Sequence, residues 1–188
     1  MARVTYRDVA DLKPEDHDLL KRPISLFRAL VNSPGGARAF HGLGNWIRHD
    51  STFDPRLREL AILQVGYVAR APYEWSHHVK IGYDFGVTDD DIRALIAETE
   101  GRESALPPLD RTVLRAAREM ARDGAMAANT YAELAKEFGD ELMVELTIIV
   151  TFYCAVVRLL ATLQIDVEPD YEPYLAAFPL PKTPLREE

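Results

Sequence analysis

The stretch from residue 57 to residue 68 constrains the fold most strongly, because it is apolar on nearly every side of a helix, with three polar interruptions. A helix that is apolar all round is buried, so this segment should lie at the centre of a helical bundle. Asp54 and Pro55 precede it, and this pair is typical of an N-cap followed by the first helical residue.

The rest of the chain also reads as helices separated by stop signals, and no run alternates with the period of two that strands show. Pro23 is expected to kink or restart the first helix. Asp110 should cap one helix, and Thr130 with Glu133 should form a capping box for another. Gly86 is a natural helix stop. The predicted segments cover residues 15–32, 34–49, 54–70, 73–85, 88–97, 110–122, 130–139 and 140–165.

Three regions follow from this pattern. Residues 51–165 form the expected helical core, with the polar loop 98–109 as the boundary between its two halves. Residues 1–50 form an N-terminal helical extension. Residues 166–188 contain five prolines and are expected to be an extended C-terminal arm.

Composition and charge exclude several classes of function. A chain of 188 residues that is 47% hydrophobic suits one domain with a real core. Its net charge of −8 disfavours a nucleic-acid partner. Arg158 interrupts the longest apolar run, 146–163, which argues for a buried helix and against a membrane span. We expect a cytoplasmic protein, because the first twenty residues lack the apolar core of a signal peptide.

Cys154 is the only cysteine, so one chain can form neither a dithiol nor a multi-cysteine metal site. This fits a reducing compartment. Embedded among apolar residues, Cys154 is most simply an inert core thiol.

The unusual segment runs from Arg70 to His78, directly after the most apolar helix of the first half. Glu74 and His78 are four residues apart and share one face of a helix. If the preceding helix packs back antiparallel, Glu59 comes near the same face. Two carboxylates and an imidazole in a half-dry setting would shift one another's pKa values and suit proton transfer. The alternatives are that Glu74 and His78 form an ordinary i,i+4 pair and that Glu59 is an early-turn charge without a partner.

No metal is expected at this segment. The side chains of His77 and His78 project about 100° apart on a helix, so a regular helix cannot easily direct both at one ion. His77 is expected to be a surface or interface residue. Trp75 is either a packing residue or part of a pocket beside Glu74.

The residues that carry this pattern resemble the carboxymuconolactone decarboxylase family, whose redox branch includes the alkylhydroperoxidase AhpD. The similarity is strongest over residues 54–96 and more diffuse over 110–165. In the redox branch a glutamate is followed by Cys-x-x-Cys and then by a histidine four residues after the second cysteine. Glu59 and His78 stand at the glutamate and histidine positions. Ala71 and Glu74 stand where the cysteines would be, so the chain resembles the non-thiol branch with a Tyr-Glu-Trp motif.

The resemblance implies an all-α, AhpD-like helical bundle that self-associates, with a trimer or hexamer expected. It also implies cofactor-free decarboxylation or proton transfer on a small carboxylated or lactone substrate. By carry-over, His78 is expected to shuttle the proton and Glu59 to orient it. Glu74 is the second acid–base candidate.

A substrate carboxylate needs a cation, and Arg56 and Arg70 flank the motif. Tyr73 and Trp75, on either side of Glu74, are expected to contact the substrate. Two other functions stay open: an AhpD-like peroxidase, which the missing dithiol disfavours, and a non-catalytic helical oligomer that binds a small molecule or a protein.

Overall fold

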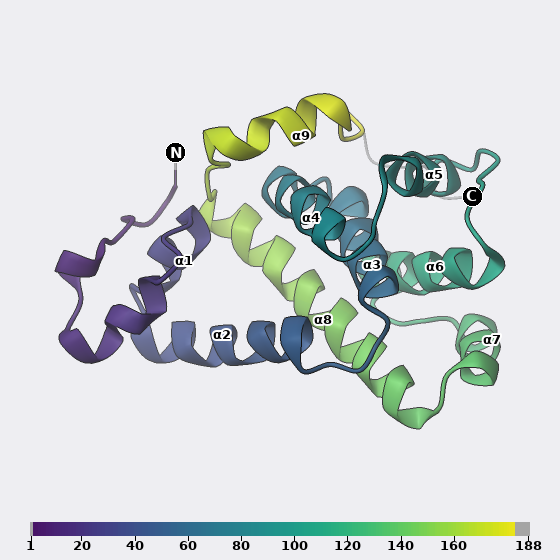
Figure 1. The fold of residues 1–188 in the computed structure, drawn as a ribbon, viewed down its shortest axis with the longest axis horizontal. Coiled ribbons are helices and arrows are strands. Elements are labelled where there is room, and N and C mark those ends of the chain that lie inside the picture. The colour runs from purple at the N-terminus through teal and green to yellow at the C-terminus, as the bar shows by residue number, and fades with distance from the viewer. Residues whose placement is uncertain (1, 183–188) are drawn as a thin grey trace.

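The computed structural model describes residues 2–182, and that span is helical with no strand. Three short 3-10 helices, η1 (Val9–Asp11), η2 (Pro14–Leu20) and η3 (Pro169–Tyr171), accompany the α-helices (Figure 1). The α-helices are α1 (Ser25–Leu30), α2 (Pro34–His49), α3 (Pro55–Val68), α4 (Pro72–Asp84), α5 (Asp89–Thr99), α6 (Pro108–Asp123), α7 (Ala128–Glu137), α8 (Asp140–Leu163) and α9 (Glu172–Ala177). The all-α prediction is confirmed.

Helix α3 is the central element, as its apolar sequence predicts. Every residue from 57 to 67 is buried, and α3 packs against α4, α5, α6 and α8. The Asp54 carboxylate accepts a hydrogen bond from the Leu57 amide at 2.8 Å, which confirms the predicted cap. Because α3 contacts α6 across the loop that follows α5, both halves of the chain share one core.

Helix α8 is the second core element and crosses the molecule diagonally (Figure 1), with α1 and α2 on one side and α5 to α7 on the other. By length and composition it could span a membrane, with a mean hydropathy of 2.1 in its most apolar window and 44% of that window buried. It packs against α3, α4, α6 and α7, as a core helix does. Its outer face leaves Val144 57% exposed.

The turn between α3 and α4 reverses the chain and sets the two helices together. Arg70 has a φ of 50° and Ala71 is extended, so α4 begins at Pro72. A β-carbon at Gly66 would lie 3.4 Å from the Trp75 backbone nitrogen, so a residue without a side chain lets the helices approach closely. This antiparallel return is the geometry needed to bring Glu59 near α4.

Two predicted helix starts are wrong, for one reason: the side chains bind other helices. Helix α6 begins at Pro108 with Pro107 as N-cap, and Asp110 lies in its first turn, paired with Arg56. Helix α7 begins at Ala128, and Thr130 lies inside it. The Thr130 hydroxyl donates to Glu119 of α6, which also accepts from the Ala127 amide. Glu119 therefore caps α7 from a neighbouring helix.

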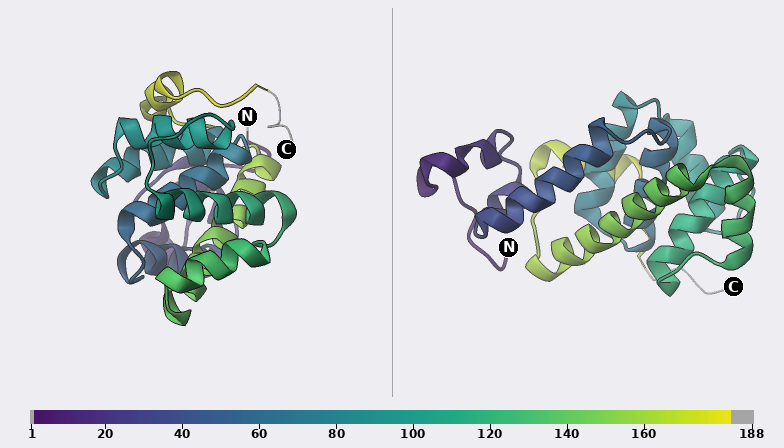
Figure 2. Two further views of the ribbon diagram at one scale, coloured as in Figure 1. Left: turned by 90° about the vertical axis from the view of Figure 1, so that its right-hand side faces the viewer. Right: turned by 90° about the horizontal axis from the view of Figure 1, so that it is seen from below.

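The N-terminal helix is interrupted at Pro23 as expected, whereas the C-terminal region differs from the sequence-based expectation. Pro23 divides the predicted helix 15–32 into η2 and α1, because proline cannot continue the hydrogen-bond ladder. The C-terminal region does not extend away: α9 packs against α4, and the Phe178 carbonyl accepts from the Trp75 indole at 2.7 Å. The end of the predicted arm, 183–188, lies outside the described residues. Figure 2 shows the N-terminal segment at one end of an elongated molecule.

Glu168 joins three of these segments. Its Oε1 accepts from the Ser25 amide at 2.6 Å and from the Tyr73 hydroxyl at 3.1 Å. Its Oε2 lies 2.8 Å from His77 Nε2. Burial opposes the charge, but His77 and the Ser25 amide stabilise it and lower the pKa of Glu168 to about 2. One carboxylate thus fastens the start of α1 and the C-terminal segment to α4.

We predict that Glu168→Ala lowers the free energy of unfolding by about 2 kcal/mol near neutral pH, because three donors lose a charged acceptor. The folded-state pKa is depressed, so this contribution is complete above the ordinary value of 4.5 and is lost as the pH falls toward 2. Urea unfolding across this range measures it. The exposed Asp170→Ala is the matched control, and an equal loss at pH 7 and pH 2.5 would contradict the assignment.

Candidate active site

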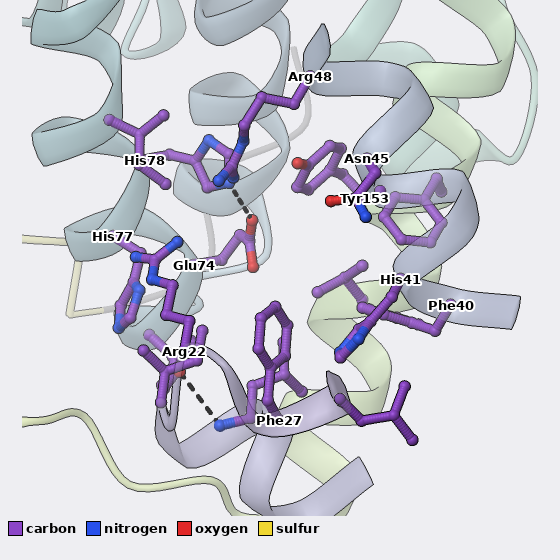
Figure 3. Close-up of a pocket in the computed structure, with 18 of the residues that line it drawn as sticks. Arg22, Phe27, Phe40, His41, Asn45, Arg48, Glu74, His77, His78 and Tyr153 are labelled. Atoms are coloured by element: carbon purple, nitrogen blue, oxygen red, sulfur yellow. Dashed lines mark hydrogen bonds and ion pairs between the residues drawn. The ribbon is translucent and has the colours of Figure 1, made fainter. Parts of the chain in front are cut away.

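A cavity of about 310 Å³ lies beside the α3–α4 pair. Three helices and the η2–α1 segment enclose it (Figure 3). Residues spaced three or four apart on α2 and on α4 form two facing walls, because that spacing keeps side chains on one helix face. The α2 wall includes Phe40, Asn45 and Arg48, the α4 wall Glu74, His77 and His78, the α8 wall Phe152 and Tyr153, and the η2–α1 segment Arg22 and Phe27.

The predicted acid–base residues meet at this cavity. His78 Nδ1 lies 2.7 Å from Glu59 Oε2, and His78 Nε2 lies 3.0 Å from Glu74 Oε1. The three side chains are buried, and Glu74 and His78 line the cavity. Figure 3 shows the second carboxylate oxygen of Glu74 directed away from His78, toward the middle of the cavity.

The electrostatics of this cluster favour an imidazolium. Burial alone would lower the pKa of His78, but the charges of Glu59 and Glu74 outweigh it and raise the pKa to about 9. Burial would likewise raise the pKa of Glu59, yet His78 and Arg58 lower it. At neutral pH a protonated His78 therefore donates one N–H to each carboxylate and holds a proton within reach of Glu74.

Arg58 is a fourth charged member of the cluster, which sequence reasoning passed over. It is 2% exposed, and its Nε donates to Glu59 Oε1 at 3.1 Å. The guanidinium also lies over the Phe85 ring, 4.4 Å from its centroid. The signal available in the sequence was a cation beside a glutamate in an otherwise apolar helix, which requires a buried partner.

Tyr153 is the second residue that the sequence did not single out, since it sits in an apolar run of α8. Its ring packs edge-on against His78 with centroids 4.9 Å apart, and it lines the cavity. Burial and the charges of Glu74 and Glu59 raise the pKa of its hydroxyl. Tyr153 therefore stays neutral and can donate a hydrogen bond to a bound molecule.

The cavity takes its cations from a different part of the chain than predicted. Arg48 of α2 and the adjacent Lys21 and Arg22 of the η2–α1 segment line it. Arg56 points elsewhere and pairs with Asp91 and with Asp110, the latter at 2.7 Å. Arg70 is exposed at the α3–α4 turn. Neither Arg56 nor Arg70 is among the described residues that line the cavity.

The aromatic neighbours of Glu74 play different parts. Trp75 is fully buried against Tyr67 and lies outside the cavity lining. Tyr73 lines the cavity, but its hydroxyl already donates to Glu168 and accepts from the Leu26 amide.

His77 is buried within the chain, where a surface or interface position was expected. Its ring stacks between Tyr73 and Tyr171, with centroid distances of 4.1 and 3.5 Å. Burial lowers its pKa, although Glu168 opposes this, so His77 is a neutral donor to that carboxylate at pH 7. It is a structural histidine at the edge of the cavity.

Redox and metal chemistry find little support in these side chains. Cys154 is buried on α8, and burial raises the pKa of its thiol, which disfavours the thiolate. Within residues 2–182, no group of three or more histidine, cysteine or acidic side chains is arranged to hold a metal ion. Both nitrogens of His78 already face carboxylates.

Residues 34–119 match the model of the carboxymuconolactone decarboxylase family. This segment starts at α2, so the match includes the wall that carries Arg48. No curated protein matches the sequence.

Solved structures share the fold at low sequence identity. A peroxidase-related protein from Ralstonia eutropha, described as an alkylhydroperoxidase AhpD core, is 16% identical with a TM-score of 0.77, covering 96% of this chain and 98% of that one. A cysteine-to-alanine variant of the debrominase Bmp8, in complex with 2,3,4-tribromopyrrole, is 20% identical with a TM-score of 0.77, covering 95% and 98%. A putative antioxidant defence protein from Agrobacterium tumefaciens is 19% identical with a TM-score of 0.65, covering 73% and 94%. The AhpD-like fold is confirmed.

We predict that His78 titrates near pH 9 in NMR spectra of the imidazole, and that Glu59→Gln or Glu74→Gln lowers this pKa by about one unit or more. Because the folded-state pKa is raised, the stabilisation is complete below the ordinary value of 6.5 and is lost as the pH rises through 9. The exposed Glu141→Gln is the control and should leave the titration unchanged. A wild-type pKa near 6.5 would contradict the buried imidazolium.

Proposed function

We propose that this chain, whose residues 34–119 match the model of the carboxymuconolactone decarboxylase family, is a cofactor-free acid–base enzyme acting on a small carboxylated or lactone substrate. The observation that carries the proposal is the buried Glu59–His78–Glu74 relay opening on a cavity. A buried proton donor with shifted pKa values in a pocket is typical of an active site.

We assign the roles within the relay differently from the sequence-based expectation. Both nitrogens of His78 face carboxylates, whereas Glu74 has an oxygen directed into the cavity. Glu74 is therefore the group that contacts the substrate, and His78 supplies its proton. Glu59 stabilises the imidazolium from the opposite side.

For decarboxylation, the bond between the substrate carbon and its carboxylate breaks and CO2 leaves. The bonding electron pair moves onto a conjugated carbonyl oxygen as an enolate. Tyr153 is the neutral donor placed to hydrogen-bond that oxygen. The proton of the His78 imidazolium then passes through the Glu74 carboxylate to the carbon, and the neutral His78 regains a proton from water.

Arg48 and Arg22 give the cavity the positive charge that attracts an anionic substrate, while Phe27, Phe40 and Phe152 supply apolar walls for an unsaturated ring. The debrominase of the same fold is described with a bromopyrrole, a small planar ring of the size that such a cavity accepts. We therefore favour a compact unsaturated ring that carries a negative charge.

Peroxide reduction is the second candidate, because similar structures are described as peroxidase-related. The chain has one cysteine, and that cysteine is buried on α8. A thiol peroxidase needs an attacking thiolate and a resolving thiol, which this site does not offer. The self-association implied by the family, as a trimer or hexamer, stays a prediction.

We predict that Glu74→Gln lowers kcat on a carboxylated lactone by about 10²- to 10⁴-fold with little change in KM, since it loses the terminal acid. Tyr153→Phe should lower kcat by about 10²-fold by removing the enolate donor. Arg48→Met should mainly raise KM. Release of CO2 from a panel of carboxylated five- and six-membered lactones provides the assay, with the exposed Arg111→Met as control. Unchanged turnover in Glu74→Gln would remove the relay from the mechanism.

We also predict that neither the wild type nor Cys154→Ser consumes hydrogen peroxide with a dithiol donor above the uncatalysed rate. Robust consumption by both proteins would favour a peroxidase without a thiol, and loss in Cys154→Ser alone would make Cys154 the reactive group.

A further inference from the structure

We propose that Arg58 is a positioning residue with two roles. It orients the Glu59 carboxylate toward His78, and it holds the Glu59–His78–Glu74 relay in a fixed position relative to the α2 wall that carries Arg48. We call this fixed position the alignment of the relay with Arg48. Arg58 lies outside the cavity lining, so it acts through these groups. The part that concerns substrate binding rests on the proposed function; the part that concerns His78 does not.

The first half of the inference comes from how the two oxygens of Glu59 are shared. Oε1 accepts from Arg58 Nε at 3.1 Å, and Oε2 lies 2.7 Å from His78 Nδ1. Arg58 and Glu59 are 2% and 1% exposed. A carboxylate bonded through both oxygens in a packed interior cannot rotate freely, so Arg58 determines which way Glu59 faces.

The second half comes from the other end of the guanidinium. Arg58 NH1 donates to the carbonyls of Ile47 and Arg48, at 3.4 and 3.3 Å. These carbonyls belong to the last turn of α2, where helix carbonyls have no partner within the helix and where a cation is favoured. Arg48 projects into the cavity from this same turn. One guanidinium thus joins the relay to the backbone that places the cavity cation.

Arg58 also sets the charge balance around the proton. The titratable or charged groups facing His78 and Glu59 are Arg58 on α3, Glu74 and His77 on α4, Arg48 on α2 and Tyr153 on α8. Without Arg58, two buried carboxylates would face the imidazolium with one nearby cation fewer. The cluster would then bind its proton more tightly and release it less readily.

Charge and geometry can be separated, because lysine keeps the charge of arginine but loses its planar fork. An ammonium group is a single point charge, and it cannot direct separate donors at Glu59 and at the end of α2 as the guanidinium does. Lysine should therefore preserve the proton affinity of the cluster but lose the alignment of the relay with Arg48. Glutamine, which is neutral, should lose both.

The experiment measures two quantities in the full-length wild type, Arg58→Gln, Arg58→Lys and the exposed control Arg111→Gln. The first is the pKa of His78, by NMR. The second is the dissociation constant of benzoate, a planar carboxylate probe, by calorimetry. Circular dichroism reports whether each variant is folded.

We expect Arg58→Gln to raise the pKa of His78 by about one unit or more, since a nearby buried cation is removed. We expect Arg58→Lys to keep that pKa within about half a unit. Both variants should weaken benzoate binding by about threefold or more, because Arg48 is then misplaced for its ion pair with the benzoate carboxylate. Arg111→Gln should match the wild type in both measurements.

A folded Arg58→Gln with an unchanged pKa of His78 would overturn the role in the relay. Arg58→Lys with wild-type benzoate affinity would overturn the proposal that Arg58 aligns the relay with Arg48. This variant decides that point even if Arg58→Gln does not fold. A wild type that does not bind benzoate would overturn both the carboxylate site of the proposed function and the alignment of the relay with Arg48. The titration of His78 would still decide the role of Arg58 in the relay.

Discussion

Four charged side chains buried at one place, Arg58, Glu59, Glu74 and His78, are the constraint on which the rest of the structure depends. Each is at most 4% exposed. A lone charge in such surroundings would be strongly disfavoured, and only a compensating partner at hydrogen-bond distance makes it tolerable. With His78 protonated, the two positive and two negative charges cancel, so the cluster is neutral as a whole. The packing of α3 against α4 must therefore hold all four side chains at hydrogen-bond distance from their partners.

The surrounding elements help to hold these four side chains in place. The turn at Arg70 and Pro72 returns α4 along α3, and Gly66 lets the helices approach. Glu168 fastens the start of α1 and the C-terminal segment to α4, and residues of the η2–α1 segment line the cavity. The predicted N-terminal extension thus supplies part of the wall of the candidate site. The predicted C-terminal arm supplies Glu168, which fastens that wall to α4.

The site also differs from the redox branch of the family it resembles at two positions. In the resemblance to the redox branch, Ala71 and Glu74 occupy the two cysteine positions, while Glu59 and His78 keep theirs. The glutamate–histidine pair is retained at 2.7 Å, and the neighbouring position now presents a carboxylate to the cavity. Ala71 and Glu74 therefore supply no thiol at these positions, and Glu74 lines the cavity as a carboxylate.

The sequence by itself determined the helical class, the central place of α3 and the shared helix face of Glu74 and His78, because apolar periodicity, helix caps and i,i+4 spacing are local signals. The contact of Glu59 with His78 depended on the antiparallel return of α4 along α3. It could not determine which cations face the cavity. Arg56 and Arg48 look alike in sequence, yet Asp91 and Asp110 from α5 and α6 engage Arg56, while α2 turns Arg48 inward. Asp110 and Thr130 look like helix caps until partners on other helices take their side chains. Tyr153 became part of the site only when α8 packed beside His78, because contacts between residues distant in sequence are decided by tertiary packing and leave no local pattern.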